Sequence, residues 1–240
     1  YIPHFYPKAA YAAMITRMDR EIGRVMKLVN ELGLDENTIF VFSSDNGPVN
    51  GTHQGLAGTD CAFFESAGGL RDGKGTLYEG GIRVPGIVKW KGRIKPGTVS
   101  ERVTGFEDWM PTLLALVGSK DSLHKGVDGI NFSQTLLGKS QKARPYLYRE
   151  FPSYGGQQSV RMGDWKGIRR NLMPRGSGKN RPRPNYHIEL YDLKTDRGET
   201  KDVSVEHPEI VKKISAIMVK ARTPSIDFPF PALDSFPGQH

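Results

Sequence analysis

The sequence predicts an α/β fold in its first part and a small α+β fold in its last part. Lys8–Leu32 repeats apolar residues at three- and four-residue steps, which is typical of a helix with one apolar face. Thr38–Phe42 is an unbroken apolar run, typical of a strand buried on both faces in a parallel sheet that helices cover. Short strand-like runs separated by turn residues, and one further amphipathic helix, predict the last part.

The first helix is expected to end at Gly33, since glycine readily adopts the left-handed conformation that closes a helix. Its apolar side chains, Met14, Met18 and Met26 among them, are expected to pack in a core. A helix, a short turn and a strand make half of a βαβ unit, so this part would lie inside an α/β sheet.

Polar residues follow the predicted strand directly, in the stretch Ser43–Pro48. Ligands of open α/β sheets bind beyond the carboxyl ends of the strands. Asp45 and Asn46 therefore lie where side-chain oxygens could hold Ca²⁺ or Mg²⁺, which prefer oxygen ligands. The alternative is an ordinary turn in which the two side chains bond their own backbone.

A long glycine-rich loop follows from Pro48 to Gly69, and Lys74 then stands between Gly73 and Gly75. Glycines let the backbone approach a ligand closely, and a lysine offers a compact cation with three donors. The order GxxxxGK[ST] is absent, which argues against binding of a nucleoside triphosphate.

The remaining elements follow in turn. Gly86–Trp90 predicts a strand, and Phe106–Val117 predicts a helix that Gly118 ends. A polar, basic stretch marks a domain boundary, so that the predicted domains are residues 1–143 and residues 144–240. The second domain should hold an antiparallel sheet and a helix over Glu209–Arg222, opened by Pro208. The strands of that sheet are expected at Tyr146–Tyr148, Ser159–Arg161, Trp165–Ile168 and His187–Tyr191.

Composition limits the function classes. The chain has 240 residues and a net charge of +8, which permits an anionic partner. Cys61 is the single cysteine, so an internal disulfide and a multi-cysteine metal site are excluded. No apolar run approaches the roughly 20 residues of a membrane span, and no membrane partner is expected. The basic stretch Arg169–Arg183 could bind the acidic groups of a sulfated glycan, or it could be a solvated loop.

The motifs resemble those of the type I sulfatase family, within the alkaline-phosphatase-like superfamily. The resemblance rests on Asp45-Asn46-Gly47, on the string from Gly73 to Pro85 (Gly-Lys-Gly-Thr-Leu-Tyr-Glu-Gly-Gly-Ile-Arg-Val-Pro), and on Asp108–Leu114. It continues through Val160–Lys166 and Glu189–Leu193, which look like the small C-terminal domain of these enzymes. It implies part of a sulfatase-like mixed sheet flanked by helices, followed by a small α+β domain.

The resemblance also implies an activity and a site. Asp45 and Asn46 match ligands of a single Ca²⁺, and Lys74 matches the lysine that binds the sulfate group. The family nucleophile is a formylglycine made within Cys/Ser-x-Pro-x-Arg. That motif is absent here, since Ala62-Phe63-Phe64 follow Cys61, whose expected role is that of a packing thiol.

We therefore expect the C-terminal portion of a calcium-dependent sulfatase, with its formylglycine upstream and the N-terminal half as a partner. The substrate would be a sulfated small molecule or glycan, and the location periplasmic or secreted. His53 could contact substrate or be an exposed loop residue, and His4 lies far from any motif. Glu79 and Arg83 are expected to be structural and to pair with each other or with nearby backbone.

Two other functions stay open from the sequence. A phosphate-ester hydrolase of the same superfamily would commonly need two metals and more Asp and His ligands. A non-catalytic basic module would bind polyanions with steep salt dependence and without need of Asp45 or Lys74. No recognised nucleic-acid motif occurs, and nucleic acid is not an expected partner.

Overall fold

The computed structural model describes residues 6–49, 60–119, 125–174 and 182–234. Contacts divide the chain into two compact units: unit 1 comprises Tyr1–Ser44 and Pro85–Pro145, and unit 2 comprises Asp45–Val84 and Tyr146–His240. The stretch from Asp45 to Val84 therefore groups with the C-terminal residues rather than with the rest of the first predicted domain. The boundary at residues 143 and 144 stays a prediction.

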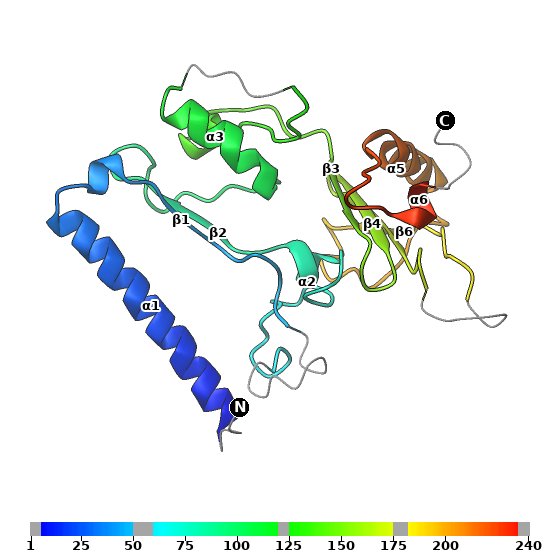
Figure 1. Ribbon diagram of the computed structural model, residues 1–240, viewed down its shortest axis with the longest axis horizontal. Helices are drawn as coiled ribbons and strands as arrows, with labels where there is room; N and C mark the ends of the chain where they lie inside the picture. The colour runs from blue at the N-terminus through cyan, green and yellow to red at the C-terminus, as the bar shows by residue number, and fades with distance from the viewer. Residues whose placement is uncertain (1–5, 50–59, 120–124, 175–181, 235–240) are drawn as a thin grey trace. The chain divides into compact units, whose positions relative to one another are not determined.

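Unit 1 begins with the long helix α1, Pro7–Glu31, which confirms the predicted helix (Figure 1). Gly33 follows it with φ of +68°, as expected for a glycine that ends a helix. The core packing expected of its methionines is not found. Met14 and Met18 are 68% and 45% exposed, and α1 buries no residue. Periodicity identifies the apolar face of a helix but says nothing of what covers it.

The short helix η1, Asp35–Asn37, leads into strand β1, Phe40–Ser43. β1 pairs antiparallel with β2, Gly86–Lys89, and Phe40 lies opposite Lys89. The prediction of a doubly buried strand in a parallel sheet is wrong for this structure, since Val41 and Phe42 are 43% and 37% exposed. An unbroken apolar run shows that both faces are apolar but carries no information on the direction of the neighbouring strand.

The rest of unit 1 consists of short helices: η2 (Phe106–Asp108), α3 (Trp109–Leu116) and α4 (Ser133–Leu136). The first two divide the helix predicted over 106–117, and Gly118 has φ of +69°. Asp108 is buried and holds this region together. Its carboxylate accepts the backbone N–H groups of Gly105 and Ile130 and pairs with Arg144 at 2.5 Å.

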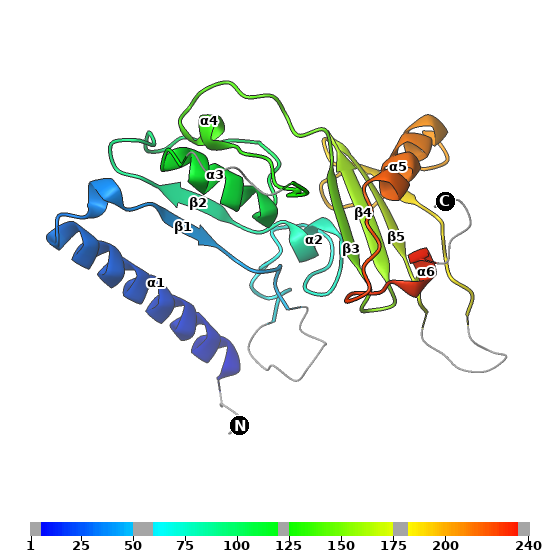
Figure 2. The ribbon, with the colours of Figure 1, turned by 45° about the horizontal axis from the view of Figure 1, so that its top comes forward.

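Unit 2 contains the predicted antiparallel sheet, whose strands lie in the order β3–β4–β5–β6. Figure 2 shows β3, β4 and β5 side by side. The strands are Leu147–Phe151, Gln157–Met162, Trp165–Arg170 and Glu189–Asp192. The predicted helix is α5, Pro208–Lys220, and it packs on one face of the sheet. Ile214 and Met218 of α5 are fully buried in one cluster with Val160 and Leu190 of the strands.

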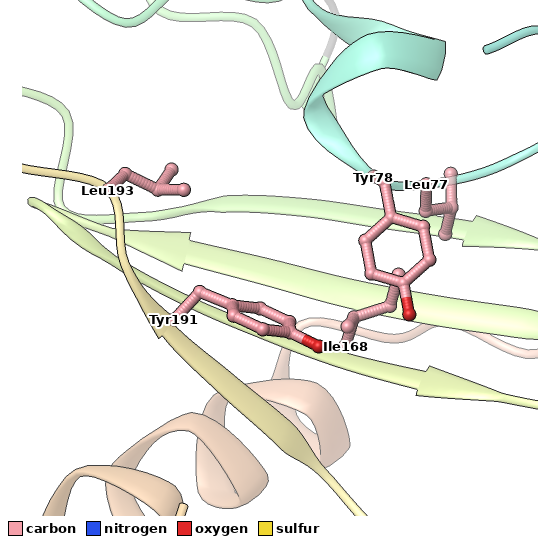
Figure 3. Packing of buried hydrophobic residues seen from close by; sticks show 5 residues of the cluster. All are labelled: Leu77, Tyr78, Ile168, Tyr191 and Leu193. Carbon is pink, nitrogen blue, oxygen red and sulfur yellow. The ribbon is translucent and has the colours of Figure 1, made fainter. Parts of the chain in front are cut away.

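The opposite face of the sheet is covered by the segment before and within α2, Glu79–Ile82. Figure 3 shows Leu77 and Tyr78 from this segment pointing toward Ile168 and Tyr191 of the sheet, with Leu193 nearby. A smaller buried cluster at the C-terminal end contains Leu172, Phe230 and Leu233, the last of which belongs to helix α6, Pro231–Asp234. In the described residues, no helix is both long and apolar enough to cross a membrane.

Alternation along β4 and β5 decides which side chains meet the α2 segment. Lys166 contacts Glu79 of that segment, whereas Gly167 abuts Ile214 of α5. A Cβ on Gly167 would lie only 2.6 Å from the Ile214 side chain, so glycine lets α5 approach the sheet. Beneath α5 the sheet presents Val160 and Leu190 together with the buried polar side chains of Gln158 and Arg169. Beneath the α2 segment, Ile168 and Tyr191 lie beside the buried charge of Lys166.

Candidate active site

The turn Asp45–Pro48 belongs to unit 2 and follows β1 in the sequence. Asp45 Oδ1 accepts the backbone N–H of Asn46 at 3.0 Å and the Asn46 side-chain amide at 2.9 Å. The local bonding that the sequence offered as an alternative is therefore present. It also holds a carboxylate and a carboxamide next to each other, with Asp45 exposed.

Gly47 joins this turn to the Glu-Gly-Gly-x-Arg stretch. Its backbone N–H donates to the carbonyl oxygen of Gly81 at 2.9 Å. A Cβ at position 47 would lie 1.7 Å from the carbonyl oxygen of Gly80, so no other residue fits without moving the backbone. The Asp-Asn-Gly motif thus lies directly on α2.

Lys74 is tied to the same turn. Its backbone N–H donates to the carbonyl oxygen of Pro48 at 2.8 Å, and the following Gly75 has φ of +91°, which favours glycine. The Lys74 side chain is exposed. It forms no ion pair with any residue that the structure describes, so its ammonium is available to an anionic ligand. The structure brings the backbones of Asp45, Asn46 and Lys74 into one bonded frame, while their functional roles remain predictions.

Glu79 anchors this frame to the sheet. Its buried carboxylate contacts Lys166 Nζ at 2.9 Å, Arg83 at 3.4 Å and Arg161 at 3.5 Å. The predicted pairing of Glu79 with Arg83 is confirmed, but the shorter contact is to Lys166. The backbone N–H of Glu79 also donates to Glu199 Oε2 at 2.7 Å, and Glu199 Oε1 lies 3.0 Å from Lys166 Nζ.

Two carboxylates therefore share the Lys166 ammonium. Burial disfavours the charged form of Glu79, but Lys166, with Arg161 and Arg83, outweighs burial and holds the pKa of Glu79 below its ordinary value. Burial also raises the pKa of Glu199, and there Lys166 does not offset it. Glu199, which is fully buried, is thus the less readily ionised partner.

A second polar cluster lies on the same face of the sheet. Glu189 accepts the hydroxyl groups of Tyr78 and Tyr191 and pairs with Arg170 at 3.2 Å. Arg71 stacks on the Tyr78 ring with 4.0 Å between its guanidinium carbon and the ring centre. It also donates to the hydroxyl of Tyr191 at 2.8 Å. The loop that carries Lys74 is thereby bonded to the sheet through Arg71 and Tyr78, which lie before and after Lys74 in the sequence.

The donors at the turn fit calcium in kind. Asp45 offers carboxylate oxygens and Asn46 a carboxamide oxygen, which are ligands that Ca²⁺ takes in sets of about six to eight. Among the described residues, no group of three or more His, Cys, Asp or Glu side chains could hold a metal. Asp45 and Asn46 would need further oxygen ligands to complete a calcium site.

Other predicted residues have different outcomes. His53 and His4 lie outside the described residues. Cys61 is a free, partly buried thiol. The basic stretch is not simply a solvated loop, because its first two arginines belong to β5. Arg169 is buried and bonds to Ser215, and Arg170 pairs with Glu189.

Sequence reasoning missed three residues that hold the frame: Gln157 and Lys166 of the sheet, and Glu199 of the loop that follows β6. Of these three residues, only Lys166 could have been recognised from the sequence, because it is a charged residue inside a predicted strand. Long-range partners of a buried charge cannot be read from such a pattern.

Comparisons with known proteins agree with the motifs. A family model described as Sulfatase matches residues 6–119, and one described as N-sulphoglucosamine sulphohydrolase, C-terminal, matches residues 69–223. An N-acetylgalactosamine-6-O-sulfatase of Bacteroides thetaiotaomicron is 30% identical over 213 residues, covering 88% of this chain and 41% of that protein. Arylsulfatase A of Homo sapiens is 30% identical over 232 residues, covering 88% of this chain and 43% of that protein.

The fold has solved relatives as well. A Bacteroides thetaiotaomicron structure, from work on the metabolism of multiple glycosaminoglycans, superimposes with a TM-score of 0.65 at 31% identity. The match covers 85% of this chain and 43% of that one. This chain spans less than half the length of the relatives that it matches.

Proposed function

This chain belongs to the type I sulfatase family, and from that membership we propose that the complete protein hydrolyses sulfate monoesters of sugars or aryl compounds. The observation that carries the proposal is the frame on which the Asp45-Asn46 turn and Lys74 are bonded together. It is supported by relatives named as sulfatases of N-acetylgalactosamine and of aryl substrates.

Each group of the frame has a physical role in this proposal. The non-bridging oxygens of a sulfate ester carry negative charge, and the Lys74 ammonium would bind and orient one of them. Asp45 and Asn46 would hold Ca²⁺ together with ligands from outside this chain. The bound ion would supply Lewis-acid polarisation of the sulfate group. The nucleophile would also come from outside this chain, since no Cys/Ser-x-Pro-x-Arg occurs in it.

The buried anchors have a separate task in the proposal. Glu79, Lys166 and Glu199 would keep the frame in place when an anion enters, because a bonded backbone resists displacement. Such fixed geometry is what makes electrostatic stabilisation effective, since the charged group need not reorganise during the reaction.

The test is substrate choice by the complete protein. We expect it to hydrolyse 4-nitrophenyl sulfate or a 6-O-sulfated amino sugar, to lose activity in a chelator, and to regain it with Ca²⁺. The same preparation should act much more slowly on 4-nitrophenyl phosphate. Faster hydrolysis of the phosphate would instead support the phosphate-ester alternative, and no turnover of either ester would refute the proposal.

A further inference from the structure

We propose that Gln157 is a positioning residue for Lys74. The inference deepens the proposed function and rests on it, because it assumes that Lys74 binds the sulfate group. Gln157 is the first residue of β4 and is 2% exposed.

The carboxamide of Gln157 forms two hydrogen bonds with the backbone that follows Lys74. Its Oε1 accepts the backbone N–H of Leu77 at 3.0 Å, and its Nε2 donates to the carbonyl oxygen of Gly75 at 2.8 Å. The two backbone partners need one acceptor and one donor, so they also determine the orientation of the amide. Among side chains of this length, only glutamine offers both groups.

These bonds complete the support of Lys74 along the chain. Gly73, which precedes Lys74, is held by a bond across the lysine. The N–H and the hydroxyl of Thr76 both donate to the carbonyl oxygen of Gly73. Lys74 itself is held by Pro48 through its own N–H. After Lys74, the bonds to Gly75 and Leu77 come from Gln157. The backbone from which the ammonium projects is thus fixed to the Asp-Asn-Gly turn on one side and to the sheet on the other.

Loss of the Gln157 amide should therefore displace Lys74 without touching the ligand. A shift of about 1 Å in a group that orients substrate can lower the rate by up to about 100-fold. Leu77 would keep a buried N–H without a partner, which favours rearrangement of this loop rather than a small local adjustment.

Gln158 offers a matched control. It is the next residue of β4, is 1% exposed, and faces α5 because strand side chains alternate. Its Nε2 donates to the Tyr148 hydroxyl at 3.0 Å and to the carbonyl oxygen of Met218 at 3.2 Å. Gln158→Met thus removes a comparable buried amide with comparable bonds, but none to the Lys74 loop.

The experiment uses the complete protein with Gln157→Met, Gln158→Met, Lys74→Ala and the two double variants with Lys74→Ala. Activity is measured as kcat/KM with 4-nitrophenyl sulfate, and hydrogen–deuterium exchange is followed in peptides that cover residues 70–80. We expect Gln157→Met to lower kcat/KM by about tenfold or more, and to lower it by less than about twofold when Lys74 is already alanine. It should also speed exchange in residues 73–77, whereas Gln158→Met should do neither.

The outcomes separate the two proposals. Unchanged exchange in Gln157→Met would overturn the inference, and so would a loss of activity that persists in full beside Lys74→Ala. If Lys74→Ala leaves activity intact, the proposed role of Lys74 fails, even where exchange shows that Gln157 holds the loop. Should Gln157→Met fail to fold, Gln157→Asn, which keeps an amide but shortens its reach, is expected to give the same pattern more weakly.

Discussion

Lys74 is the residue whose ammonium group the surrounding bonded backbone holds in place. Its side chain is exposed and makes no ion pair with a described residue, while its backbone is bonded on both sides. In the complete protein, Lys74→Ala should lower kcat/KM for a sulfate ester by on the order of 100- to 1000-fold, the scale of one charge-stabilising donor. Lys194→Ala, at an exposed turn lysine of the same unit, should change it little. An equal effect of the two variants would show that Lys74 has no special role.

Asp45 is the charged member of the proposed calcium pair. In the complete protein, Asp45→Ala should shift the Ca²⁺ concentration that restores half of the activity after chelation upward by at least about tenfold, because a carboxylate ligand is lost. Asp164→Ala, at the exposed β4–β5 turn, is the control. Calcium titration of the activity is the measurement, and superimposable curves would exclude Asp45 as a ligand.

The contact of Gly47 with Gly80 joins the Asp45–Pro48 turn to helix α2. Gly47→Ala would force a methyl group into the carbonyl oxygen of Gly80, and overpacking of this kind costs about 1–3 kcal/mol. Gly86→Ala, where the added carbon meets nothing within 4 Å, should be nearly neutral. Chemical denaturation of the three proteins measures the difference. A Gly47→Ala protein as stable as Gly86→Ala would show that the turn does not rest on α2.

The sheet face beneath α2 should make stability depend on pH through Glu189. Burial opposes its ionisation, but Tyr78, Tyr191 and Arg170 outweigh burial and hold the pKa of Glu189 below the ordinary value of 4.5. A carboxyl with a lowered folded-state pKa stabilises the fold above pH 4.5, and this contribution is lost as the pH falls through the folded pKa. The free energy of unfolding should therefore fall as the pH drops below 4.5 and through the folded-state pKa of Glu189.

The control for this prediction is Glu189→Gln, which cannot ionise. Its unfolding free energy should be lower than that of the unaltered protein at neutral pH and should change less toward acid. Glu79, whose pKa is also lowered, contributes with the same sign, so the variant should keep part of the dependence. Parallel pH curves for the two proteins would contradict the assignment to Glu189.

At the scale of the whole chain, the two units differ in how much apolar surface they bury. Among the described residues, Phe132 is the one large hydrophobic side chain that unit 1 buries, whereas unit 2 holds three buried clusters. Exchange protection rises with buried contacts, so amides of β4 and β5 in the 240-residue chain should exchange much more slowly than amides of α1. Hydrogen–deuterium exchange by peptide measures this. Equal protection of α1 and β4 would mean that α1 buries its apolar face in solution.

The amino-acid sequence alone predicted the main helices and strands, and it named Asp45, Asn46 and Lys74 as candidate site residues. Helical periodicity predicted α1 and α5, and turn residues predicted the four short strands, because these signals are local. The motifs around Asp45, Asn46 and Lys74 were likewise readable as residue types in a fixed order.

How these parts are held together depends on contacts between residues far apart in the sequence. The antiparallel pairing of β1 with β2, the bonds from Gln157 to Gly75 and Leu77, and the sharing of Lys166 by Glu79 and Glu199 join residues far apart in sequence. A local pattern shows that a strand is apolar or that a lysine lies within it, but not which neighbour it meets. Buried charges and amides must find partners, and the folded backbone selects which ones lie within reach.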